Sequence, residues 1–423
     1  MSLISNLHFP FKLKKDQEEA VKSWIDNNYK GSIIFSTGTG KTEIALECAK
    51  KASEILSQKK IFNILFLVPR IILIEQNIKR LENYGIKKEL VGTYYGEHKK
   101  IKEITISTYQ SLVKNLEIIR NFDMIILDEV HLVSQTAIKY SKIFDVIVEH
   151  PSLAILCLTA TIDEQDPKYS KILSLAPPVK KYSIDEAVND GRLTKPRIIV
   201  QPVNFTNDEK IQYDQVSIKI KNISFMLRSS DPSKISKLLR FGGNKSRLAK
   251  QWFENVRIRK KLLVESKYKI DATVDIIQKH KNEKIMIFSE TIESLEKISN
   301  VLNKKKILSK IITNKIRKKE RQDILDMWGK NFSILLSVHT LEIGFDIPSV
   351  RIAIIMSNTY NINQLVQRIG RVLRKSDNKE EALVYVVYIK QTKDTKIVNM
   401  LGNTFKKNVN EKKVQNRISS YFQ

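Results

Sequence analysis

The sequence is poor in cysteine, with only Cys48 and Cys157 in a chain of 423 residues. Two cysteines so far apart in sequence indicate neither a disulfide framework nor a zinc site, and such usage is typical of a reducing compartment. Cys157 lies inside the apolar run AILCL, so we expect its side chain in a hydrophobic core.

Long hydrophobic runs are also absent. The most apolar stretch, IFNILFLVPRIILIEQ, is interrupted by Asn63, Pro69 and Arg70, so no stretch reaches the ~18 apolar residues of a membrane span. The N-terminal segment MSLISNLHFPFKLKK lacks the long apolar run of a signal peptide. We therefore expect a soluble, intracellular protein of the cytoplasm or nucleoid that has no membrane partner.

Acidic residues are outnumbered by basic ones, because 46 Asp and Glu stand against 73 Lys and Arg, a formal net charge of +27. An excess of this size attracts polyanions and favours nucleic acid or an acidic membrane surface as a partner. Coding bias towards lysine would give the same charge on an ordinary solvated surface, so the charge alone does not decide between these interpretations.

Short apolar runs alternate with helical patterns in two parts of the chain, and the length allows two or three domains of roughly 100–200 residues. The runs are SIIFS (32–36), IFNILFLVP (61–69), EITIST (103–108), FDMIILD (122–128) and LAILCLT (153–159), then KIMIFS (284–289), FSILLSV (332–338), RIAIIMS (351–357) and EALVYVVYI (381–389). Continuous Ile, Leu and Val runs indicate strands buried on both faces, and their alternation with helices predicts doubly wound α/β domains with parallel sheets.

The segment between the two α/β parts differs in character, with 18 basic and 6 acidic residues from Lys195 to Lys269. Its amphipathic patterns predict a basic helical insertion. Four aromatic residues there either stack on bases or form the insertion's own core: Phe225, Phe241, Trp252 and Phe253. The predicted domains are 1–183 (first α/β domain), 184–272 (insertion), 273–392 (second α/β domain) and 393–423 (basic tail).

A glycine-rich segment, Ser36 to Thr42 (STGTGKT), follows the first predicted strand and precedes a helix. Glycines let backbone N–H groups wrap phosphates, and the helix N-terminus adds positive potential. We expect Thr37, Gly38, Thr39 and Gly40 to cradle the phosphates of ATP. Lys41 is expected to reach the β- and γ-phosphates, and the Thr42 hydroxyl to bind Mg²⁺.

The second element, Asp128-Glu129-Val130-His131, stands at the end of the predicted strand FDMIILD. An acidic residue at the carboxyl end of a parallel strand is where a P-loop domain holds Mg²⁺, so we assign this role to Asp128, directly or through another ligand of the metal. Glu129 would polarise the attacking water as a general base. A GTPase would need an Asn/Thr-Lys-x-Asp motif, which is absent, and a small kinase would not need a second α/β domain.

Taken together, the motifs resemble those of superfamily 2 helicases, and within them the XPB-like branch, over about residues 9–390. The matching segments, in order, are Gln17, STGTGKT, LVPRIILIEQ (67–76), ISTYQSL (106–112), DEVH, LTAT (158–161), IMIFSETIESLEKI, LLSVHTLEIGFDIP (335–348) and QRIGRVLR (367–374). The resemblance implies two RecA-like domains that close on ATP and move along a nucleic-acid strand.

The resemblance also implies roles for individual residues. Gln17 would recognise adenine, and Gly344 and Asp346 would lie at the domain interface in contact with the nucleotide. Arg371 and Arg374 would act as arginine fingers, supported by Gln367 and Arg368, since a guanidinium supplied from the other domain makes hydrolysis depend on closure. The residues that would couple nucleotide to nucleic acid are His131, Thr159, Ala160 and Thr161.

Four departures from the family pattern bear on function. Phe35 stands where the strict P-loop has its first glycine, and Glu164-Gln165-Asp166 replaces the Arg-Glu-Asp element linked to strand separation. Ile343 occupies a position that is commonly acidic. Because the motifs begin near residue 9, we expect no counterpart of the large N-terminal damage-recognition region of eukaryotic members. These departures weaken a prediction of unwinding more than one of translocation.

We therefore expect an ATP-dependent helicase or translocase that uses Mg²⁺ and acts on DNA in preference to RNA. One alternative is a clamp in which ATP is only a ligand, but an intact Glu129 with Arg371 and Arg374 argues against it. Another is the motor subunit of a restriction or defence complex. Since the sequence shows no nuclease-like cluster of carboxylates and lysine, the nuclease would then be an accessory partner protein.

Overall fold

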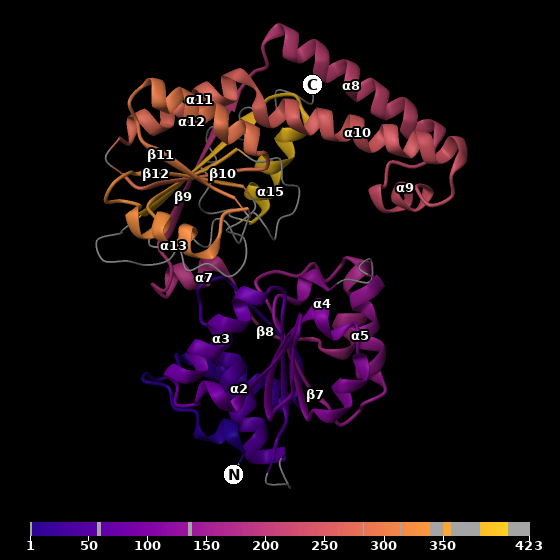
Figure 1. The fold of residues 1–423 in the computed structure, drawn as a ribbon, viewed down its shortest axis with the longest axis vertical. Coiled ribbons are helices and arrows are strands. Elements are labelled where there is room, and N and C mark those ends of the chain that lie inside the picture. Colours follow the sequence, from indigo (N-terminus) through magenta and orange to yellow (C-terminus); the bar gives the residue numbers. More distant parts are fainter. Residues whose placement is uncertain are drawn as a thin grey trace. The chain divides into compact units, whose positions relative to one another are not determined.

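The computed structural model describes residues 2–56, 61–133, 138–281, 283–313, 315–338, 350–356 and 381–404. The chain divides into two compact units, Met1–Leu193 and Thr194–Gln423 (Figure 1). Among the described residues, no helix is both long and apolar enough to cross a membrane.

The first unit is built on an eight-stranded sheet with the order β4-β3-β5-β2-β6-β7-β1-β8, in which only the β3–β4 pair is antiparallel. Its strands are β1 (Lys30–Phe35), β2 (Ile64–Val68), β3 (Val91–Tyr95), β4 (His98–Lys100), β5 (Ile104–Thr108), β6 (Met124–Leu127), β7 (Ala154–Thr159) and β8 (Pro178–Tyr182). Every residue of β2, β5, β6 and β7 is buried, as the continuous apolar runs predict.

Helices cover both faces of this sheet, with α2 and α3 on one face and α4 and α5 on the other (Figure 1). The helices of the unit are α1 (Lys15–Asp26), α2 (Lys41–Leu56), α3 (Ile71–Asn83), α4 (Tyr109–Leu112), α5 (Ile138–Val148), α6 (Ser170–Leu175) and α7 (Ile184–Asn189). Cys157 lies fully buried within the core beneath α4 and α5, as predicted, and Cys48 is buried in α2.

The second unit has a six-stranded sheet of parallel strands in the order β11-β12-β10-β13-β14-β9. Its strands are β9 (Lys195–Val203), β10 (Ile285–Ser289), β11 (Ser309–Ile312), β12 (Ile334–Val338), β13 (Ile352–Ile355) and β14 (Glu381–Ile389). The helices are α8 (Asn207–Met226), α9 (Pro232–Leu238), α10 (Gly243–Glu265), α11 (Lys267–Lys279), α12 (Ile292–Lys304), α13 (Lys318–Met327) and α15 (Lys396–Thr404). The predicted fold class, two α/β units with mostly parallel sheets, is confirmed.

The basic insertion is a helical hairpin in which α8 and α10 lie side by side, with α9 at its far end (Figure 1). Its small core contains Ile220, Ile223, Ile235, Ala249 and Trp252, with Phe253 packed against it. Each of the two alternatives therefore applies to two of the four aromatic residues. Trp252 and Phe253 form the core, whereas Phe225 and Phe241 are 86% and 80% exposed.

The structure draws the boundaries of this insertion differently from the predicted span 184–272. Helix α7 belongs to the first unit, whereas β9 pairs along its whole length with β14 and α11 contributes Ile270 and Val274 to the core of the second unit. Only α8 to α10 form the hairpin. The prediction missed β9 because Pro196 and Pro202 suggest irregular structure, but β9 is an edge strand, where proline is tolerated.

Candidate ATPase site

Three neighbouring strands of the first sheet, β6, β7 and β1, end at the same edge because they run parallel. The glycine-rich segment follows β1, the Asp-Glu pair follows β6, and the Thr159–Thr161 segment follows β7. The carboxyl edge of a parallel sheet is where such folds bind ligands. Three sequence motifs far apart in the chain therefore meet at this edge.

The loop after β1 takes a conformation that its glycines permit. Gly38 and Gly40 have φ angles of 83° and 85°, in the left-handed region that favours glycine. Thr39 Oγ1 donates to the carbonyl of Ser36 at 2.6 Å and closes the turn. Lys41 is the first residue of α2, and its Nζ donates to the carbonyl of Phe35 at 3.0 Å. The ammonium group therefore lies against the loop that is expected to bind phosphate.

Two hydroxyls of this loop have no hydrogen-bond partner among the described residues. Ser36 Oγ and Thr37 Oγ1 are both buried atoms. Buried polar atoms are almost always paired, and unpaired ones at a helix N-terminus are well placed for an anionic ligand. The donors around the loop therefore fit the oxygens of a phosphate.

Gln17 of α1 contacts the same loop. Its Nε2 donates to the carbonyl of Thr39 at 3.1 Å, and its Oε1 accepts from the backbone of Lys14 at 2.9 Å. A Cβ at Gly40 would lie 2.3 Å from Gln17 Nε2, so no larger residue fits there without displacing that amide. The structure thus brings the predicted adenine-recognising glutamine against the phosphate loop.

In the acidic pair after β6, Glu129 has a strained backbone and Asp128 has a raised pKa. Glu129 has a φ of 51°, in the left-handed region, and its N–H donates to Asp128 Oδ1 at 3.0 Å. Burial, with a smaller contribution from Glu129, raises the pKa of Asp128 to about 7, whereas Lys41 opposes the rise. Tyr109 Oη donates to the carbonyl of Asp128 at 2.7 Å and fixes the end of the strand.

A chain of short contacts joins the acidic pair to the loop after β7. His131 Nδ1 lies 3.3 Å from Glu129 Oε2 and 3.0 Å from Thr159 Oγ1. Thr159 Oγ1 in turn donates to the carbonyl of Thr161 at 2.8 Å, across the buried Ala160. The four residues expected to couple the sites are therefore contiguous with the expected general base.

The remaining predicted site residues lie outside the described residues: Gly344, Asp346, Gln367, Arg368, Arg371 and Arg374. Ile343 lies outside them as well. The Glu164-Gln165-Asp166 segment is described, and it serves local structure. Asp166 caps a 3₁₀ turn (Pro167–Tyr169) through the backbone of Lys168, and Glu164 forms an ion pair with Lys181.

Sequence reasoning missed three residues around the phosphate loop: Asp16, Tyr182 and Arg192. Arg192 Nη1 donates to Asp16 Oδ2 at 2.5 Å and to the carbonyl of Thr39 at 3.3 Å. Tyr182 is the last residue of β8, and its backbone carbonyl accepts a hydrogen bond from the N–H of Ser36 at 3.0 Å. No motif marks these positions, and the only signal for Asp16 is that it precedes Gln17.

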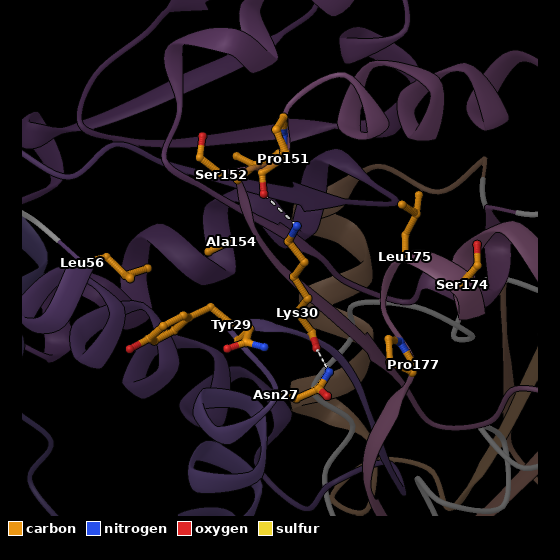
Figure 2. A pocket seen from close by; sticks show the side chains of 12 residues that line it. Asn27, Tyr29, Lys30, Leu56, Pro151, Ser152, Ala154, Ser174, Leu175 and Pro177 are labelled. Carbon is orange, nitrogen blue, oxygen red and sulfur yellow. Dashed lines mark hydrogen bonds between the residues drawn. The ribbon is translucent and has the colours of Figure 1, made fainter.

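A pocket of about 530 Å³ lies at the other edge of the same sheet (Figure 2). It is lined by residues before and at the starts of β1 and β7, and Lys30 Nζ reaches across it to the carbonyl of Pro151 at 2.7 Å. The phosphate loop follows the opposite end of β1. This pocket is therefore separate from the ATPase site.

Family models match both units. The model of the type III restriction enzyme, res subunit, matches residues 10–164, and that of the helicase conserved C-terminal domain matches residues 268–376. In fold, the chain is similar to the DNA-bound ATP-dependent type ISP restriction-modification enzyme LlaBIII (TM-score 0.62, 18% identity, 95% of this chain and 30% of that chain). It is also similar to the Hef helicase domain of Pyrococcus furiosus (TM-score 0.54, 18% identity, 90% and 96%).

The phosphate loop, the Asp-Glu pair and a second parallel α/β unit define the class of superfamily 2 helicases. The chain is 30% identical over 410 residues to the DNA 3'-5' translocase XPB2 of Sulfurisphaera tokodaii, covering 94% of this chain and 87% of that protein. It is 22% identical to the DNA 3'-5' helicase XPB of Mycobacterium tuberculosis, covering 86% of this chain and 58% of that protein. The chain belongs to the XPB-like family of superfamily 2 helicases, and it is an ATP-hydrolysing helicase or translocase.

Proposed function

We propose that this protein moves along DNA in the 3'-to-5' direction, driven by ATP hydrolysis in the presence of Mg²⁺. The observation that carries the proposal is the meeting of the phosphate loop, with its unpartnered hydroxyls, and the Asp128–Glu129 pair at one sheet edge. The direction and the choice of DNA are supported by the XPB-like relatives, which are a DNA 3'-5' translocase and a DNA 3'-5' helicase.

The residues of the first unit divide the chemistry between them. Thr42 and Asp128 would hold Mg²⁺, which would supply positive charge to the phosphates when bound. Lys41 would leave the carbonyl of Phe35 to contact the β- and γ-phosphates. Glu129 would accept a proton from the attacking water, while His131 holds its carboxylate in place. The second unit would supply Arg371 and Arg374 to the γ-phosphate, and Gly344, Asp346, Gln367 and Arg368 would support that closed state.

The helical hairpin offers a surface for the DNA. From α8 to α10 it carries 14 basic and 6 acidic residues, and Lys234, Lys237 and Arg240 at its far end are exposed. Phe225 and Phe241 stand exposed among these charges. Cationic side chains bind phosphates without reading sequence, and exposed aromatic rings stack on bases, so we expect sequence-tolerant binding.

The test is an ATPase assay with single-stranded DNA, duplex DNA, forked DNA and RNA in parallel, with Lys41→Ala as the inactive control. We expect DNA to stimulate phosphate release more than RNA does, and the best activator is then used in a strand-displacement assay with 3' and 5' overhangs. ATP binding without stimulated release would contradict the motor. Equal stimulation by RNA would contradict the choice of DNA.

A second candidate is a duplex translocase that drives an accessory nuclease. The match of residues 10–164 to the restriction-enzyme res subunit favours it, together with the loss of the Arg-Glu-Asp element at Glu164-Gln165-Asp166. The two functions differ in outcome. Duplex-stimulated ATPase activity with displacement of a bound triplex strand, but without unwinding of forked DNA, would favour translocation; unwinding would favour a helicase.

A further inference from the structure

Arg192 is a buried cation at the point where the first unit ends. Its side chain is only 6% exposed, and the first unit ends at the next residue, Leu193. The guanidinium stacks over the ring of Tyr182, with 5.4 Å between Cζ and the ring centroid. It therefore has a fixed environment on three sides, made by Asp16 of α1, Thr39 of the phosphate loop and Tyr182 of β8.

The backbone before Arg192 is built to hold this position. Helix α7 begins with a capping box between Ser183 and Glu186. It ends at Asn189, and Asp190 caps it. The next residue, Gly191, has a left-handed φ of 65°, and the N–H of Arg192 donates to the carbonyl of Ala187 at 2.8 Å. Such a glycine-terminated helix end reverses the chain sharply, which turns Arg192 back towards the phosphate loop.

Arg192 contacts both the phosphate loop and the carboxylate of Asp16 beside it. Burial raises the pKa of Asp16, and the charge of Arg192 opposes that rise, so the ion pair offsets a desolvation cost. The carbonyl of Thr39 accepts from both Arg192 and Gln17. Arg192 Nη2 is buried without an acceptor among the described residues, so this nitrogen remains available to a new acceptor when the loop changes conformation.

We propose that Arg192 is a positioning residue that links the state of the phosphate loop to the segment joining the two units. Leu193 and Thr194 are buried, and β9 of the second sheet begins at Lys195. A displacement of β9 is thus transmitted over three residues to the guanidinium and from there to the carbonyl of Thr39. The inference rests on the proposed DNA-stimulated ATPase cycle, in which the chain segment from Arg192 to Lys195 would connect β9 with the phosphate loop.

The test compares basal and DNA-stimulated turnover in Arg192→Gln, which keeps a donor but removes the charge and the second prong. We expect the ratio of stimulated to basal kcat to fall about tenfold, within the usual range of coupling between sites, while the KM for ATP changes less than about twofold. Arg192→Lys should recover part of the ratio, because it restores the charge beside Asp16 without the fork of the guanidinium.

Lys180→Gln is the matched control. It breaks the 2.6 Å ion pair between Lys180 of β8 and Glu19 of α1, the elements that also carry Tyr182 and Asp16. The two side chains of this pair are 29% and 44% exposed. This control should leave both rates within about twofold of the wild type, as expected for an exposed pair. Asp16→Asn serves as a second test variant if Arg192→Gln folds poorly, and it should lower the same ratio.

Three outcomes would overturn the proposal. Equal losses of basal and stimulated turnover would show that Arg192 only supports the fold, as would a lower Tm with an unchanged ratio. A raised KM for ATP with an unchanged ratio would show that it binds the nucleotide instead. Failure of the proposed function is distinguishable, because then the wild-type protein itself shows no stimulation by DNA.

Discussion

Glu129 combines a proposed chemical role with a left-handed backbone conformation. A non-glycine residue in the left-handed region costs of order 1 kcal/mol, and such residues cluster at functional sites where their surroundings hold them. Here the hydrogen bond from its N–H to Asp128 and the contact of its carboxylate with His131 keep the side chain in place. We therefore propose that this conformation directs the carboxylate towards the site.

Replacing this carboxylate should separate binding from turnover. We expect Glu129→Gln to bind ATP within a few-fold of the wild type but to lower kcat by about 10²–10⁴, the usual contribution of a general base. Nucleotide binding by fluorescence titration and phosphate release measure the two quantities. Glu149→Gln, on an exposed ion-pair partner of Arg120, is the control and should change neither. Turnover retained in Glu129→Gln would assign the base to another residue.

The thiols of Cys48 and Cys157 should be unreactive in the folded protein. Burial raises the pKa of Cys157 to about 12 and that of Cys48 well above its usual value. The reactive thiolate appears only as pH rises through the folded pKa, so at pH 8 its population is negligible. We expect a charged thiol reagent to label neither cysteine natively and both after denaturation. Native labelling would show that these helices and strands open readily.

The sequence indicates the residues proposed to contact phosphate, but it does not indicate those that hold the phosphate loop in place. Lys41, Thr42, Asp128 and Glu129 belong to short motifs whose spacing follows from the chemistry. Arg192 follows Thr39 by more than half the length of the first unit, and no local pattern indicates that Gly191 turns it back. Long-range contacts of this kind arise from packing, which single-sequence periodicity does not contain.

At the scale of elements, the strands that periodicity missed are β3, β4, β8, β9 and β11. Four of them are the outermost strands of the two sheets. Edge strands have one unpaired side facing solvent, so they tolerate lysine and proline, as in PVKKY and KPRIIVQPV. The central strands carry the apolar runs, and the sequence predicts these because both their faces are buried.

The hairpin offers a test of how its aromatic residues divide. Trp252 is 5% exposed and donates to Ser224 Oγ at 2.8 Å, whereas Phe225 is 86% exposed. We expect Trp252→Ala to destabilise the hairpin by about 3–5 kcal/mol. Phe225→Ala should leave stability nearly unchanged but weaken single-stranded DNA binding by about 1–3 kcal/mol. Denaturant unfolding and a binding titration measure these quantities, and a stability loss in Phe225→Ala would contradict the assignment.

A buried ion pair ties α11 to the segment after β14. Lys269 Nζ lies 2.6 Å from Asp394 Oδ2, and the two side chains are 0% and 1% exposed. We expect Lys269→Met to destabilise the second unit by about 3–5 kcal/mol, because it leaves a buried carboxylate unpaired. Lys267→Met, on an exposed neighbour in the same helix, should have little effect on the denaturation midpoint. Similar midpoints for the two variants would show that the pair contributes nothing.

At the scale of the whole molecule, the net charge of +27 should dominate DNA affinity. Binding to phosphates releases counterions, so a protein that contacts 6–10 phosphates loses roughly 10³–10⁵ in affinity between 50 and 200 mM salt. We expect the Kd for DNA to rise with salt to this extent and to differ little between DNA sequences. Fluorescence anisotropy measures both. A Kd insensitive to salt would show that contacts to bases, and not to phosphates, dominate binding.

The pairing of β9 with β14 sets an order of events during synthesis. The ribosome makes β9 before the hairpin and every other strand of its sheet, and β14 comes last. The first unit precedes β9 in the chain, whereas β9 has no partner strand until β14 has been made, so its backbone groups stay exposed to water in the meantime. Pauses in translation between these two strands would prolong that exposure. Codon usage in this part of the mRNA would therefore affect the fraction of protein that aggregates.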